Sequence, residues 1–272
     1  MRRVRVTLLY AAALTLVALV MLQLAPQSQQ SVIRHASTNL HNLAHGHLGT
    51  LIGSAFVNEA GPIYLWLPGL VALLALGELL WHGRRLVIAF AVGHIGATVI
   101  VAAGLAAAIA AGLLAKSVAD AADVGMSYGA VAVLGTFTTA LPRWWRAVWA
   151  GWWIAVASWA VIVGAGDFTN IGHLVALLLG MAVASRFATS LVDWTPLRVA
   201  LLAIAAGFGY LMIAYNDMST MRAALVGSAG ALTGGAISAL RTQTNSSALA
   251  SIQSDSHDSG GHSSNSPGNS HS

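Results

Sequence analysis

The feature that most constrains this chain is its series of long apolar stretches. A membrane-spanning helix needs about 20 mostly apolar residues, and seven stretches close to that length follow one another along the 272 residues. Only 8% of the residues are charged, against about 25% in soluble domains, so lipid must be the solvent for most of the chain. We therefore predict an all-α fold, a polytopic transmembrane helical bundle. The predicted spans are residues 4–24, 63–80, 86–114, 124–141, 145–164, 171–187 and 197–215.

The two ends of the chain leave alternatives open. An apolar run behind three arginines is also typical of a signal peptide, but its length and a poor cleavage sequence favour an uncleaved membrane anchor. Residues 222–240 are apolar but rich in Gly, Ala and Ser, so the chain has seven or eight spans. Residues 241–272 are mostly Ser, Gly, Asn and His, a composition that cannot bury enough apolar surface to fold. We expect a transmembrane domain over 1–240 and a disordered tail over 241–272.

The basic residues predict the orientation, because cytoplasmic loops have an excess of Lys and Arg. If the N-terminus lies in the cytoplasm and the spans alternate, nine arginines fall inside and three basic residues fall outside before the tail. We therefore expect a multi-pass protein of the cell membrane with a cytoplasmic N-terminus. The inside set is Arg2, Arg3, Arg5, Arg84, Arg85, Arg143, Arg146, Arg186 and Arg198, and the outside set is Arg34, Lys116 and Arg222.

Composition also excludes several classes of function. The chain has no cysteine, which excludes disulfides and thiolate catalysis. Its net charge of +4 is scattered, so we expect no nucleic-acid partner. No glycine-rich phosphate loop follows a credible strand, and we expect no cofactor. Four histidines precede the second span, and imidazoles bind Zn²⁺, but no carboxylate or cysteine lies among them. We favour solvated histidines and expect no metal. The four are His35, His41, His45 and His47.

One serine and one histidine form a candidate catalytic pair. Spans four and six both enter the membrane from the outer face in this topology, with Ser127 and His173 in their first turns. The two side chains should therefore lie at similar depth, where a nucleophile could meet its general base. The N–H groups at a helix start would also attract developing negative charge. Small residues that allow close helix contact in lipid accompany both: Gly125, Gly129, Ala132 and Gly135 on one span, and Ala176 and Gly180 on the other.

Structural roles for the same residues are common. Most serines in apolar helices bond a backbone carbonyl one turn back, and most Gly and Ala pairs serve packing alone. A histidine within a membrane is costly to bury, which favours a specific role for His173. His94, in the third span, could line a polar pathway, but bonding to a neighbouring helix is the favoured reading.

These motifs resemble those of the rhomboid family of intramembrane serine proteases. Gly125-Met126-Ser127 is similar to the family's Gly-x-Ser-Gly motif, and His173 to the histidine that starts its sixth core helix. Glu78, followed by Gly83-Arg84-Arg85, is similar to the family's Glu, Gly and Arg region at the end of helix two. The resemblance covers roughly residues 50–187. It is closest to divergent rhomboid-like proteins of actinobacteria, where Gly-x-Ser-Tyr-Gly is usual.

The resemblance implies a fold and a reaction. It implies a six-helix core with one or two extra C-terminal helices, Ser127 as nucleophile and His173 as general base. Substrates would be transmembrane proteins in the lipid bilayer, and the oligomeric state is left open. Two features depart from the family. Tyr128 replaces a glycine, and the family's His-x-x-x-Asn pair falls near Pro62 and Trp66. Loss of an oxyanion donor typically lowers the rate by about 10² to 10³.

Two other functions follow from these departures and from the fold class. A rhomboid-fold protein without activity would bind transmembrane clients. A small transporter would need charges at mid-bilayer and paired broken helices, and the sequence shows neither clearly, since Asp123 and Asp167 fall at the ends of loops.

Overall fold

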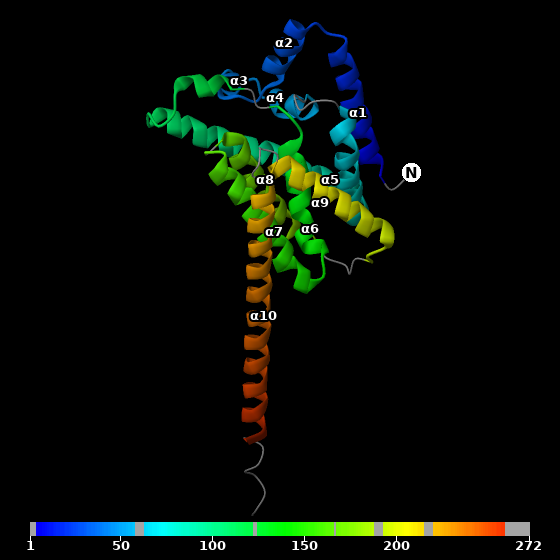
Figure 1. Ribbon diagram of the computed structural model, residues 1–272, viewed down its shortest axis with the longest axis vertical. Helices are drawn as coiled ribbons and strands as arrows, with labels where there is room; N and C mark the ends of the chain where they lie inside the picture. The colour runs from blue at the N-terminus through cyan, green and yellow to red at the C-terminus, as the bar shows by residue number, and fades with distance from the viewer. Residues whose placement is uncertain are drawn as a thin grey trace, which may run out of the picture.

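All of the regular secondary structure in the described part of the chain is helical. The computed structural model describes residues 4–57, 63–121, 124–165, 167–187, 193–214 and 220–258, and this part contains no strand. The predicted all-α bundle is therefore confirmed (Figure 1). Its helices are α1 (Arg5–Leu22), α2 (Pro26–Ala36), α3 (Leu40–Ala44), α4 (Thr50–Gly53), the 3-10 helix η1 (Ser54–Phe56), α5 (Ile63–Ala110), the 3-10 helix η2 (Lys116–Asp120), α6 (Ser127–Ala140), α7 (Arg143–Val163), α8 (Phe168–Ala184), α9 (Pro196–Ala214) and α10 (Thr220–Asp258).

Five of the described helices are long and apolar enough to cross a membrane, namely α1, α5, α7, α9 and the first part of α10. Helix α5 accounts for two predicted spans, because its 48 residues are interrupted at His82. There φ is 65° and ψ is 158°, a left-handed conformation that a residue with a Cβ rarely adopts. The first arm of α5 thus ends at Trp81 and the second begins at Gly83.

Helix α6 is the buried centre of the bundle. All of its residues except the first and two threonines near its end are buried. It packs against α5, α8, α7 and α9, which surround it in Figure 1. A helix with apolar residues on every side is stable only when it is enclosed in this way, so its neighbours decide what can reach it.

The first turn of α1 is attached to the bundle by Glu78 of α5. One carboxylate oxygen accepts from the Val6 amide at 3.0 Å, and the other accepts from the amide and the hydroxyl of Thr7, each at 2.8 Å. Helix α1 has no N-cap side chain of its own, so Glu78 supplies acceptors for amides that lack a partner within the helix. Glu78 therefore attaches the start of α1 to α5.

Several contacts gather the arginine-bearing helix ends at one end of the bundle. The Arg198 guanidinium, at the start of α9, donates to the Leu79 carbonyl at 3.4 Å. The Arg85 guanidinium lies 5.4 Å from the centre of the Phe187 ring, just beyond α8. Together with the contact of Glu78 to α1, these contacts place the bend of α5, the end of α8 and the starts of α1 and α9 together. We call this the arginine end of the bundle.

Helix α10 packs along α7 and then projects beyond the bundle (Figure 1). Gly230 and Gly234 bring its backbone against Gly151 and Ala147 of α7, so closely that a Cβ on either α10 glycine would overlap the α7 backbone. This is small-residue packing of the kind expected in lipid. Residues 220–244 are long and apolar enough to form an additional span. The helix continues to Asp258, past the domain boundary expected at residue 240. Residues 259–272 lie outside the described part, so the disordered tail stays a prediction.

Candidate active site

The candidate nucleophile Ser127 is the first residue of α6 and is half-buried. Two residues earlier Gly125 has φ +126°, which only glycine adopts without strain. The Gly125 amide donates to the Ser54 carbonyl at 2.9 Å, and this bond ties the loop to η1. The Ala130 amide donates to the Met126 carbonyl at 3.0 Å. This bond belongs to the first turn of α6, where the N–H groups of a helix point out of its start.

The candidate base His173 lies in the second turn of α8, one turn deeper than the sequence indicated. The difference arises because α8 begins at Phe168, where the Asp167 side chain accepts from the Thr169 amide at 2.8 Å and caps the helix. His173 is 5% exposed. Its ring therefore lies in the interior of the bundle, screened from water.

Helices α6 and α8 run parallel, in close contact. Near the site, Gly172 of α8 lies against the Tyr128 ring of α6. Further along, Gly135 of α6 faces α8, and a Cβ added at Gly135 would lie 2.5 Å from the Leu177 carbonyl oxygen. At Gly180 a Cβ would overlap the carbonyl of Ala132. The contacts therefore run in the same direction along both helices, and the turns that contain Ser127 and His173 lie at the same height along the bundle.

The immediate neighbour of His173 is Tyr128, the residue after Ser127. The two rings meet edge to face, with centroids 5.5 Å apart and an interplanar angle of 85°. Within the described residues, neither ring nitrogen of His173 has a hydrogen-bond partner, so no bond to Ser127 is formed in this state. Catalytic hydrogen bonds are often long or absent before substrate binds. The Ser127–His173 dyad therefore stays a prediction.

A second serine–histidine contact lies beside this site, and sequence reasoning did not anticipate it. Ser54 Oγ and His94 Nε2 are 3.1 Å apart, with Ser54 fully buried and His94 5% exposed. The hydrogen-bond partner of His94 thus belongs to the short 3-10 helix η1 and not to one of the long neighbouring helices. Because the Ser54 carbonyl also accepts from Gly125, the pair connects the second arm of α5 to the loop that precedes Ser127.

The positions of the family's oxyanion pair fall near Pro62 and Trp66. Trp66 lies in the first arm of α5 at the edge of the apolar core, and its indole N–H is buried without a partner among the described residues. Pro62 lies outside the described residues. The backbone at the start of α6 is the other candidate source of oxyanion donors for this site.

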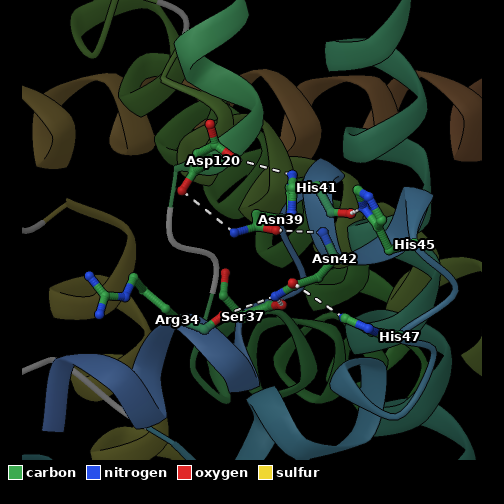
Figure 2. A network of polar contacts seen from close by, with 8 residues as sticks. All are labelled: Arg34, Ser37, Asn39, His41, Asn42, His45, His47 and Asp120. Carbon is green, nitrogen blue, oxygen red and sulfur yellow. Dashed lines mark hydrogen bonds and ion pairs between the residues drawn. The ribbon is translucent and has the colours of Figure 1, made fainter. Parts of the chain in front are cut away.

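The histidines that precede α5 form hydrogen bonds to other protein groups (Figure 2). The ring nitrogen Nδ1 of His45 lies 2.7 Å from the His41 carbonyl, and His41 pairs with Asp120 of η2 at 3.7 Å. Asn42 donates to the carbonyls of Arg34 and Ser37, at 2.9 and 2.8 Å. In the described part of the chain no three His, Asp or Glu side chains are grouped as metal ligands. The network supports the extramembrane segment between α2 and α5.

These features define a class of protein. The described chain is a multi-pass helical membrane protein with a serine at the start of one core helix and a buried histidine on the parallel helix beside it. The family model described as "Rhomboid-like protein" matches residues 1–190, and the chain belongs to the rhomboid-like family. No curated protein and no solved structure matched the chain in the corresponding comparisons.

Proposed function

We propose that this protein is a rhomboid-like intramembrane serine protease that cleaves transmembrane substrates, with Ser127 as nucleophile and His173 as general base. The observation that supports this most directly is the parallel register of α6 and α8, in which the turn of Ser127 meets the turn of His173. A half-buried hydroxyl beside a dry imidazole is what this chemistry requires. The proposed kinship with actinobacterial members rests on the Gly-x-Ser-Tyr-Gly form of the motif.

The proposed reaction uses groups of this chain only. Ser127 Oγ attacks a peptide carbonyl while His173 accepts the hydroxyl proton, and His173 later donates that proton to the leaving amine. Amides at the start of α6 stabilise the oxyanion, because the N–H groups of a helix start attract developing negative charge. Water then hydrolyses the acyl-enzyme. For Ser127 and His173 to bond, Tyr128 has to shift from its place against the imidazole.

The proposed location is the cell membrane, with a cytoplasmic N-terminus. The arginine end of the bundle then lies in the cytoplasm, as the excess of basic residues on that side favours. The start of α6 lies at the opposite end, so the scissile bond would be cleaved in the outer half of the bilayer.

A second candidate function is the binding of transmembrane clients without cleavage. The edge-to-face contact of Tyr128 with His173, and the absence of a bond from His173 to Ser127, favour it. A binder of this kind would associate equally well with its clients when both residues are replaced by Ala.

The deciding experiment is cleavage of a model transmembrane substrate in proteoliposomes. The wild type should cleave it, while Ser127→Ala and His173→Ala should not. Ser228→Ala is a matched control, because Ser228 Oγ donates to the Ala224 carbonyl of its own helix and lies on the exposed side of α10. Labelling of the wild type by a fluorophosphonate, lost in Ser127→Ala, would identify the nucleophile. Equal cleavage by wild type and Ser127→Ala, or cleavage by neither, would refute the protease proposal.

A further inference from the structure

A cavity of about 770 Å³ lies between α7, α9 and α10, away from the candidate active site. Its volume falls within the roughly 300 to 1,000 Å³ of small-molecule sites. Tryptophan rings form much of its wall, and none of them has a role in the proposed reaction. They are Trp145, Trp149, Trp152 and Trp153 of α7 and Trp194 before α9.

The cavity is as long as one leaflet of a membrane is thick. Its lining begins with Leu141 and Pro142, just before α7, and extends along α7 to Trp153. From the start of α7 to Trp153, a rise of about 1.5 Å per residue makes roughly 15 Å, half of the ~30 Å hydrocarbon thickness of a bilayer. It begins at the start of α7, beside Arg143. The cavity therefore starts near the headgroups and ends near the bilayer centre.

The wall offers mostly apolar surface to an occupant. The indole nitrogens of Trp149 and Trp153 are buried without a hydrogen-bond partner among the described residues, so these two atoms do not face the open space and the rings present carbon to it. The Tyr210 hydroxyl, also on the wall, already donates to the Thr220 carbonyl. An occupant should thus have an apolar body.

The charges beside the opening favour an anion. Arg143 and Arg146 flank the lining residue Trp145, and Arg198 precedes the lining residue Val199. Arg146 and Arg198 also donate to main-chain carbonyls, which fixes their positions, while Arg143 is exposed. Asp193 is the carboxylate next to this opening. Three cationic groups against one acidic group leave a positive mouth.

We propose that this cavity binds one anionic glycerophospholipid from the leaflet at the arginine end. An acyl chain would lie along the tryptophans, and the phosphate would lie beside Arg143 and Arg146. The site shares no residue with Ser127 or His173, so it stands or falls independently of the protease proposal.

The test is lipid retention by the purified full chain in detergent, measured by native mass spectrometry during titration with phosphatidylglycerol or phosphatidylcholine. The wild type should prefer phosphatidylglycerol by about tenfold or more, and its melting temperature should rise with that lipid alone. Trp149→Ala removes a ring from the cavity wall, so affinity should fall roughly three- to tenfold. Trp159→Ala is the matched control, because it removes a ring of the same size that is not on this wall.

Two further pairs of variants distinguish recognition of the lipid headgroup from binding of the acyl chain. Gly207→Phe should exclude the lipid and leave the fold intact, because Gly207 is on the cavity wall and a Cβ there meets nothing within 4 Å. Gly104→Phe, equally open but elsewhere, should bind normally. Arg143→Gln should abolish the preference for phosphatidylglycerol, and Arg34→Gln, near the other end of the bundle, should not.

Three results would overturn the proposal. They are equal retention of the two lipids by the wild type, equal affinity of Trp149→Ala and Trp159→Ala, and undiminished lipid binding by a folded Gly207→Phe. Occupation of the cavity by a second copy of the chain or by a client helix, seen as a mass shift in place of lipid, would also overturn it.

Discussion

Replacing Glu78 by Ala should detach the first turn of α1. The carboxylate is 6% exposed and accepts three hydrogen bonds from Val6 and Thr7. Hydrogen bonds to a charged group contribute about 1.5 to 3 kcal/mol each, so three at the lower limit total about 4.5 kcal/mol. Val6 is only half-buried and its amide can regain water. We therefore expect Glu78→Ala to lower the free energy of unfolding by about 3 kcal/mol.

The assay is equilibrium unfolding of the purified protein in mixed micelles, together with proteolysis of α1 in the folded state. Thr7→Val removes only the hydroxyl bond and should cost about 1.5 kcal/mol, the lower limit used above. In the Glu78→Ala background the same change should cost almost nothing, because its acceptor is gone. A loss below about 1 kcal/mol in Glu78→Ala, or an equal cost of Thr7→Val in both backgrounds, would refute this account of how α1 is held.

Three further predictions concern the site and the topology. Gly180→Ala should destabilise the protein by about 1 to 3 kcal/mol, because the new Cβ overlaps α6, whereas Gly104→Ala should be close to neutral when both are compared by unfolding. Ser54→Ala should cost about 1 to 3 kcal/mol, since it leaves His94 buried without its partner; an unchanged stability would count against the Ser54–His94 link. In a chain without cysteine, single replacements Trp144→Cys and Leu113→Cys should react with an impermeant maleimide from opposite sides of the membrane, Leu113→Cys from outside. Labelling of both from the same side would contradict the topology.

The helices and their pairing could be predicted because lipid leaves few alternatives. Apolar length sets where the spans are, and small residues such as Gly135 and Gly180 reveal which faces approach. Their contacts in the structure are those that the spacing indicated. The topology predicted that Ser127 and His173 lie at similar depth, each in the first turn of its helix. His173 lies in the second turn instead, because Asp167 caps α8 earlier than the apolar pattern suggests.

Contacts made by residues outside the regular spans could not be predicted in this way. Ser54 belongs to a segment too short to cross a membrane, and no periodicity connects it to His94. The bend at His82 is a backbone conformation that residues other than glycine rarely adopt, so no residue type signals it. The partners of Glu78 within the described residues are Val6 and Thr7 of α1, and no sequence pattern indicates which backbone amides a carboxylate will bind.

The glycine contacts between α6 and α8 have a consequence for how such a protein can change over time. Gly135 and Gly180 let the two helices pack closely because they have no side chains, while the proposed chemistry depends on Ser127 and His173. Replacement of the serine or the histidine would therefore remove the proposed reaction and keep the glycine contacts between the helices. Because the helix packing and the proposed reaction depend on different positions, a protein with this fold can change between enzyme and binding protein through single substitutions while it remains folded.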